Sequence, residues 1–389
     1  MKTDNYLKIG IFGGTFNPPH IGHVKSAMAA AEQLELDRLI IVPAGIPPHK
    51  AMPAGSPSAE MRLHMTRTAF EEMHSAIVLD IEIYNTVPNY TVQTVSIIKQ
   101  DYPNARLYLL TGTDMYLTLD MWKNSEELLK AITPIVFFRS AEDIEKITEY
   151  SQNLQNRNGV RTITVKNDVI DISSSQLRDM LPERKGIGYI ADTTYAYIIA
   201  NRLYGAKPDW EWLREQAYSM LNPARIPHVA GCEEEALRLA KRWNVDPDDA
   251  REAAILHDIT KRLNLEENLR ILEEHSVLIG KLELGEEKLL HSKSGAALAK
   301  TLFGVSDKVA DAISWHTTGR AGMTDLDKII YLADYIEPMR DFPGVEDLRA
   351  AAYADINKAV KIGLELSVQD MRERGITPNK ITFEALNDL

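Results

Sequence analysis

The stretch KIGIFGGTFNPPHIGH at residues 8–23 decides the fold of the first half of this chain. It contains a short apolar run at 7–12, stops at Gly13-Gly14 and continues into a helical pattern at about 23–34. A strand, a glycine turn and a helix in this order predict a βα unit. Backbone N–H groups and the helix dipole meet at such a turn, so we expect it to bind phosphate.

Further apolar runs in the first half have the length and composition of strands, and helical patterns lie between most of them. These runs cover residues 38–42, 77–79, 106–111, 135–138 and 162–165. Strands that alternate with helices predict an α/β domain with a mostly parallel sheet and helices on both faces. The glycine and prolines of residues 45–57 predict a long mobile loop.

The pattern changes after Asp192, and a length of 389 residues exceeds what one hydrophobic core usually organises. The stretch TTYAYIIANRLYG at 193–205 predicts a closing helix that ends at Gly205. Helical periodicity then dominates and β-branched runs disappear. We therefore predict two domains, 1–206 and 207–389, of which the second is all-α.

Composition restricts the partners and the compartment. The hydrophobic fraction of 44% and the charged fraction of 26% are ordinary for a globular protein. A formal net charge of -12 leaves no general basic surface, so we expect no nucleic-acid partner and local basic groups for phosphate ligands. The single cysteine, Cys232, is typical of a reducing compartment. We find neither an apolar signal core nor a membrane span, so we expect a cytoplasmic protein with no membrane partner.

The glycine turn excludes two common phosphate chemistries. It matches neither the G-x-G-x-x-G of dehydrogenases nor the G-K-[ST] ending of a P-loop. His20 and His23 flank Gly22, so the loop can direct two imidazoles at one phosphate chain. The alternative is that both histidines only cap the following helix. His64 and His74 lie on a polar helical stretch and are predicted to be surface residues.

This stretch resembles the H-x-G-H signature of the nucleotidylyltransferase superfamily, and its extended form resembles the bacterial nicotinate-nucleotide adenylyltransferases. The resemblance covers roughly the first half of the chain. It continues through P-P-H-K at 47–50, N-Y-T at 89–91, G-T-D at 112–114, Leu119 with Trp122, and I-S-S-S-Q-L-R at 172–178. The chain has Asn17 where the family often has Asp, and Ser175 where it often has Thr. Both departures keep a small polar group.

The resemblance implies a Rossmann-like nucleotidylyltransferase domain that joins ATP and nicotinate mononucleotide, with Mg²⁺ bridging the phosphates. Such in-line transfer needs positioning and charge neutralisation rather than a covalent nucleophile. The implied catalytic residues, which hold or close over the ATP phosphates, are His20, His23, Lys50 and Arg178. The implied substrate contacts are Gly13, Gly14, Thr15, Phe16, Tyr90, Thr91, Gly112, Asp114, Trp122, Ile172, Ser173 and Ser174.

Among these contacts, Trp122 would stack on the nicotinate ring, and Tyr90 with Thr91 would position the mononucleotide. Another acceptor, pantetheine phosphate or nicotinamide mononucleotide, stays open. Trp122 and the P-P-H-K motif favour nicotinate.

The second half contains a separate set of candidate metal ligands. An acid inside an apolar helix, such as Asp334, is costly unless it is paired or metal-bound. Imidazoles mixed with carboxylates suit iron, manganese or zinc. His275 lies in a polar stretch and is predicted to be a surface residue. The candidate ligands are His228 before a long helix, His257 and Asp258 at the end of one, His291 opening another, His316 at a helix end, and Asp334. The alternative is that these are satisfied polar residues of the core.

The motifs H-V-A-G-C, L-H-D-I-T-K, L-L-H-S-K-S-G-A, W-H-T-T-G-R and A-D-Y-I-E-P together resemble the YqeK-type HD-superfamily proteins. The resemblance covers nearly all of the chain after about Trp210. It implies symmetrical hydrolysis of diadenosine tetraphosphate to two ADP at a centre of one or two transition-metal ions, with iron expected. A two-metal centre lowers the pKa of a bridging water.

By the same resemblance His228, His257, Asp258 and Asp334 hold the first metal. His291 and His316 hold a second one, bridged through Asp258. Lys261, Arg320 and Arg340 would contact phosphate. Cys232 could approach the site, but a buried structural thiol is the expectation. Two alternatives for the HD half stay open: it binds a nucleotide only as a regulatory module, or it hydrolyses another nucleotide. An oligomer also stays open.

Overall fold

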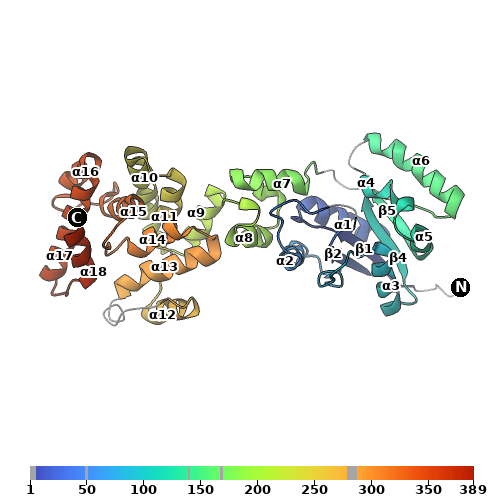
Figure 1. The fold of residues 1–389 in the computed structure, drawn as a ribbon, viewed down its shortest axis with the longest axis horizontal. Coiled ribbons are helices and arrows are strands. Elements are labelled where there is room, and N and C mark those ends of the chain that lie inside the picture. Colours follow the sequence, from blue (N-terminus) through green and yellow to red (C-terminus); the bar gives the residue numbers. More distant parts are fainter. Residues whose placement is uncertain (1–5, 49–50, 139–140, 167–169, 278–286) are drawn as a thin grey trace. The chain divides into compact units, whose positions relative to one another are not determined.

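The computed structural model describes residues 6–48, 51–138, 141–166, 170–277 and 287–389. The chain divides into two compact units, one formed by residues 1–198 and 202–207 and the other by residues 199–201 and 208–389. Figure 1 shows strands in the first unit and helices in the second. No helix in the described ranges is long and apolar enough to cross a membrane.

The first unit contains a six-stranded sheet in the order β3-β2-β1-β4-β5-β6, and every strand pair is parallel. The strands are β1 (Lys8–Gly14), β2 (Arg38–Pro43), β3 (Ala76–Val78), β4 (Arg106–Gly112), β5 (Ile132–Phe137) and β6 (Ile163–Val165). This confirms the predicted α/β fold. The strand order reverses between β1 and β4, and such folds bind ligands beyond the carboxyl ends of the strands at that switch point.

Helices cover both faces of the sheet. The strands are therefore buried on both sides and carry apolar residues at successive positions. Ile9 and Ile11 of β1 pack with apolar residues of α3, α5 and α6. Phe12, the next residue, packs with residues of α1 and α2 on the opposite face. The helices are α1 (Ile21–Leu34), α2 (Ala59–Ala69), α3 (Thr91–Asp101), α4 (Thr113–Tyr116), α5 (Ser125–Ala131), α6 (Ala141–Asn158), α7 (Ser174–Met180) and α8 (Asp192–Ala200).

The end of the first unit differs from the prediction. The helix predicted to close at Gly205 ends at Ala200, and a separate 3-10 turn covers Leu203–Gly205. Arg202 and Tyr204 have φ of 47° and 60°, which an α-helix cannot continue through. The Tyr204 hydroxyl donates to Asn17 Oδ1 at 2.8 Å, so a tertiary contact accompanies this conformation. The predicted loop at 45–57 has neither helix nor strand in its described residues.

The second unit is all-α in its described residues, as predicted. Its helices are α9 (Trp210–Ser219), α10 (Ile226–Trp243), α11 (Pro247–Leu256), α12 (Leu265–Glu274), α13 (Glu287–Phe303), α14 (Asp307–Trp315), α15 (Asp325–Ile336), α16 (Val345–Ala354), α17 (Ile356–Glu373) and α18 (Lys380–Asp388). His228 lies inside the first turn of α10 rather than before it, because the helix begins at Ile226 and Pro227 is compatible with its first turn. His291 lies within α13 rather than at its start.

Candidate active sites

A hollow of about 230 Å³ opens at the switch point of the sheet, where β1 and β4 end. The indole of Trp122 forms part of its wall, and Trp122 Nε1 donates to Thr118 Oγ1 at 3.2 Å. Tyr90 is not among the lining residues; it is the N-cap of α3, and Lys123 Nζ lies 4.0 Å from its ring centroid. The predicted substrate residues that line the hollow are Gly13, Gly14, Thr15, Thr91, Gly112 and Trp122.

One acid of this hollow was missed by sequence reasoning. Glu82 is the only ionisable residue among the described residues that line it, and it is buried. Thr94 Oγ1 donates to Glu82 Oε1 at 2.5 Å. Burial raises the pKa of Glu82, while the Thr94 hydrogen bond lowers it in part. No periodic signal in the sequence could have identified this residue, because it lies in the irregular segment between β3 and α3.

His20 and His23 meet at the N-terminus of α1. The backbone N–H of His20 donates to His23 Nδ1 at 3.2 Å, and the two ring centroids are 3.7 Å apart. The His23 side chain therefore does cap the N-terminus of α1, as the alternative interpretation proposed. It does not displace the phosphate interpretation, because both imidazoles still lie where the helix dipole favours an anion. The Phe16 side chain is buried and packs on Phe12 and Phe70, so any substrate contact of Phe16 would be through its backbone.

Residues 172–178 dock onto the same loop. Arg178 Nη1 donates to the Asn17 carbonyl at 2.7 Å, and Ser174 Oγ donates to the Pro18 carbonyl at 2.8 Å. Ser173 caps α7, since its Oγ accepts from Gln176 N at 3.2 Å. These contacts bring a guanidinium to the turn that carries the two histidines.

Three predicted residues of the first unit are not brought into these contacts. Ile172 is buried, and Asp114 is exposed in the first turn of α4 without lining the hollow. Lys50 lies outside the described residues. His64 and His74 are exposed, as predicted.

A buried arginine, also missed by the sequence analysis, joins the loops that follow β1 and β2. Arg62 of α2 is 2% exposed. Its guanidinium donates to the carbonyls of Thr15, Ala44 and Gly45 at 2.8, 2.6 and 2.8 Å. Burial lowers the pKa of Arg62. Since Thr15 and Ala44 line the hollow, Arg62 fixes the shape of its rim.

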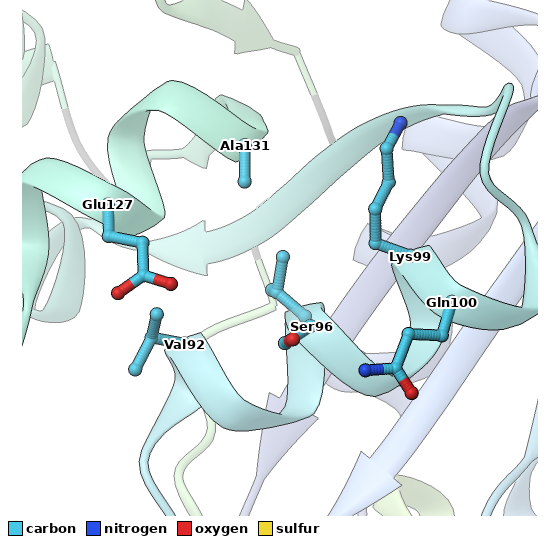
Figure 2. A pocket seen from close by; sticks show the side chains of 7 residues that line it. Val92, Ser96, Lys99, Gln100, Glu127 and Ala131 are labelled. Atoms are coloured by element: carbon cyan, nitrogen blue, oxygen red, sulfur yellow. The ribbon is translucent and has the colours of Figure 1, made fainter.

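A second hollow of about 260 Å³ lies between α3 and α5, with Val92 in its wall (Figure 2). Lys99 and Glu127 are its charged lining residues. Lys99 Nζ donates to the Ala105 carbonyl at 2.7 Å, and Glu127 Oε2 accepts from Asn124 Nδ2 at 3.4 Å. Both charged groups therefore already have partners, and no predicted site residue lines this hollow. We assign it no ligand.

In the second unit the predicted metal ligands converge around Asp258. His257 Nε2 lies 3.4 Å from Asp258 Oδ2, and His291 Nε2 lies 3.1 Å from Asp258 Oδ1. His316 Nε2 is 3.7 Å from Asp258 Oδ1 and 3.2 Å from His291 Nε2. Two sets have ligand atoms within 4.8 Å of one another, namely His228, Cys232, His257 and Asp334, and His257, Asp258 and His316.

Helix ends and first turns supply most of these side chains. His228 Nε2, from the first turn of α10, lies 3.1 Å from Asp334 Oδ1 of α15. His257 and His316 are the C-cap residues of α11 and α14, and their Nδ1 atoms lie 2.7 Å from the carbonyls of Ala254 and Ile313. Since a carbonyl can only accept a hydrogen bond, Nδ1 keeps its proton and donates, and Nε2 carries the lone pair that a metal needs.

The electrostatics of the cluster favour ionised carboxylates, and they favour neutral imidazoles at His291 and His316 but not at His257. Burial lowers the pKa of His316 and lowers that of His291 to about 4. Burial alone would raise the pKa values of Asp258 and Asp334, but the neighbouring histidines hold both well below the usual value. Burial alone would lower the pKa of His257, but the charge and hydrogen bond of Asp258, together with the Asp334 charge and the Ala254 carbonyl, raise it.

Two of the three basic residues predicted to contact phosphate lie beside the cluster. Lys261 Nζ lies 3.0 Å from His291 Nε2, and Arg340 Nη2 lies 2.6 Å from Asp334 Oδ1. Arg320 is instead engaged with Asp327 at 2.9 Å and Asp311 at 3.1 Å. Arg225, which the sequence analysis overlooked, contacts Asp258 Oδ2 through Nη2 at 2.5 Å. Its place three residues before His228 is the signal that could have found it.

The residues present fit a divalent metal. His257 Nε2 is buried and has no hydrogen-bond partner among the described residues, a costly arrangement for a polar atom unless a ligand satisfies it. Cys232 is buried as expected, and its Sγ lies 3.4 Å from His228 Nε2. Nitrogen and oxygen donors in this mixture suit iron, manganese or zinc.

Comparisons with known proteins find a separate family match in each half of the chain. The sequence profile of the cytidylyltransferase-like family matches residues 11–180, and that of the HD domain matches 225–339. A probable nicotinate-nucleotide adenylyltransferase of Carboxydothermus hydrogenoformans is 39% identical over 198 residues, which are 51% of this chain and 98% of that protein. The corresponding protein of Clostridium novyi is 33% identical over 183 residues, or 47% and 91% of the two chains.

For the second half, a similar solved structure is a predicted HD superfamily hydrolase involved in NAD metabolism from Clostridium acetobutylicum. It is 35% identical and covers 47% of this chain and 97% of its own, with a TM-score of 0.46. Since the first unit matches its relatives over almost their whole length, the chain belongs to the nicotinate-nucleotide adenylyltransferases of the cytidylyltransferase-like family, and its second half carries an HD domain.

Proposed function

We propose that the first unit transfers the adenylyl group of ATP to nicotinate mononucleotide, giving nicotinate adenine dinucleotide and pyrophosphate. The observation that carries this proposal is the Trp122-lined hollow, whose rim continues into the loop where His20, His23 and Arg178 meet. The names of the similar proteins support the same reaction.

In this reaction an oxygen of the mononucleotide phosphate bonds to the α-phosphorus of ATP, and the bond to the pyrophosphate oxygen breaks. His20, His23 and Arg178 neutralise the charge that moves onto the leaving pyrophosphate, and the N-terminus of α1 adds to that stabilisation. Mg²⁺, when bound with ATP, shields the phosphates. Trp122 orients the acceptor ring.

The purified protein should be incubated with ATP, Mg²⁺ and each candidate acceptor, with the products identified by chromatography. We expect the deamido dinucleotide from nicotinate mononucleotide. Faster turnover of nicotinamide mononucleotide or pantetheine phosphate would contradict the proposed acceptor while keeping adenylyl transfer.

For the second unit we propose hydrolysis of diadenosine tetraphosphate to two ADP, with iron as the expected metal. The observation that carries this proposal is the convergence of the candidate ligands on Asp258, with Arg225, Lys261 and Arg340 beside them. An acidic chain has no general affinity for a polyphosphate, so these local cations must supply it. A bound metal would lower the pKa of the attacking water, whose oxygen ends on one ADP while the other ADP leaves.

The test uses the intact chain with diadenosine tetraphosphate, before and after chelation. Chelation and Asp258→Ala should each abolish ADP release, and iron or manganese should restore activity to the chelated protein. Adenylyl transfer assayed with Mg²⁺ should be unchanged by Asp258→Ala. Formation of ATP and AMP would contradict symmetrical cleavage, and tight binding without turnover would favour a regulatory nucleotide-binding module.

A further inference from the structure

Glu337 lies directly behind one of the candidate metal ligands. It is the C-cap residue of α15, and it is 1% exposed. Its Oε1 lies 3.1 Å from Nδ1 of His228, while Nε2 of the same ring lies 3.1 Å from Asp334 Oδ1. The two ring nitrogens of His228 therefore face two different carboxylates.

His228 differs in this respect from two other imidazoles of the cluster. His257 and His316 have backbone carbonyls beside Nδ1, whereas His228 has a carboxylate. A carboxylate that accepts a hydrogen bond from Nδ1–H fixes the tautomer and the ring orientation, and it makes Nε2 a stronger donor to a metal than a carbonyl does.

A glycine makes room for this carboxylate. Gly231 lies inside α10, where glycine is unfavourable relative to alanine, so its presence needs a reason. A Cβ at Gly231 would stand 2.7 Å from Glu337 Oε2. That contact is too short, so any larger residue would push the carboxylate away from His228. The glycine of the H-V-A-G-C motif is explained by this close approach.

Backbone and side-chain contacts anchor Glu337 itself. Its Oε2 accepts from the backbone N–H of Met339 at 2.6 Å, and Arg340 Nε lies 3.8 Å from Oε1. One oxygen is thus held by the turn after α15, which leaves the other to face His228.

We propose that Glu337, in the space left by Gly231, is the positioning residue that holds His228 in its metal-binding tautomer and so tightens divalent-metal binding. This inference rests on the metal centre of the proposed hydrolase. In such carboxylate–histidine pairs, loss of the outer partner weakens metal affinity by about 10- to 100-fold.

The test measures the affinity for Co²⁺, used as the probe metal, by competition with a chromophoric chelator. Glu337→Gln should weaken Co²⁺ binding by about 10- to 100-fold and alter the visible spectrum of the bound ion. The matched control is Glu235→Gln, since Glu235 is a buried acid of α10 whose Oε1 accepts from the Tyr353 hydroxyl. This control should leave Co²⁺ affinity unchanged.

Two further variants distinguish positioning from a general loss of structure. Gly231→Ala should also weaken Co²⁺ binding, because the added methyl group displaces the Glu337 carboxylate from His228. Melting followed by circular dichroism shows whether each variant is folded. In a His228→Ala background, Glu337→Gln should cause no additional loss, because its effect passes through His228. An additional loss of the same size there, or unchanged affinity in Glu337→Gln, would overturn the inference. No Co²⁺ uptake by the unsubstituted protein would overturn the metal centre itself and this inference with it.

Discussion

At the residue scale, the chemistry of the first unit depends on imidazoles placed at a helix N-terminus. His20→Ala should lower kcat for adenylyl transfer by about 100-fold, because its contact strengthens as charge develops on the phosphates, with little change in the KM for the mononucleotide. Steady-state kinetics with both substrates measure this split. His64→Ala is the matched control, since His64 is exposed on α2 and packs on Tyr197. Unchanged turnover in His20→Ala would remove the assigned role.

Glu82 gives a second prediction at this scale, because burial raises its pKa above the usual 4.5. A carboxyl whose pKa is higher in the folded chain stabilises the fold below its unfolded pKa and loses that contribution as pH rises through the folded pKa. Glu82→Gln, which cannot ionise, should therefore raise the melting temperature at neutral pH but not below pH 4.5. Melting curves across this range, with exposed Glu72→Gln as the control, measure the effect. An equal gain in melting temperature at every pH would show that ionisation of Glu82 does not cause the gain.

At the element scale, the loops after β1 and β2 depend on an arginine contributed by α2. Arg62→Met would leave the carbonyls of Thr15, Ala44 and Gly45 without their donor, at a cost on the order of 3 kcal/mol of unfolding free energy or more. Denaturant unfolding of the variant measures this loss. Arg67→Met is the matched control, because Arg67 lies on the same helix with about half its side chain exposed. Equal losses in the two variants would contradict a specific role for Arg62.

The sequence predicted the positions of the strands better than it predicted the end of the helix before Gly205. The strands of the parallel sheet were all identified, because burial on both faces gives continuous apolar runs. The helix before Gly205 ends earlier than periodicity predicts, since Arg202 and Tyr204 adopt positive φ while Tyr204 contacts Asn17. Local pattern carries no information about a partner 187 residues away.

At the scale of the whole molecule, the two units have separate site residues. Division of the chain after Lys207 gives fragments 1–207 and 208–389, which differ from the two compact units only in residues 199–201, so we expect both fragments to be soluble. Adenylyl transfer should remain with the first fragment and metal-dependent hydrolysis with the second. Separate expression, followed by both assays and melting of each fragment, checks this. An insoluble or inactive fragment, next to an active intact chain, would show that the units share essential contacts.

The sequence by itself determined the α/β and all-α halves and the residues that could carry chemistry. Periodicity follows from local burial, and the histidine and glycine motifs are local in the chain. The tertiary structure alone decided which charged groups face one another. It placed Arg225 on Asp258 across 33 residues and Glu337 on His228 across 109 residues. Such pairs form where helices from distant parts of the chain pack, and the energy that selects them arises from shared burial rather than from spacing in the sequence.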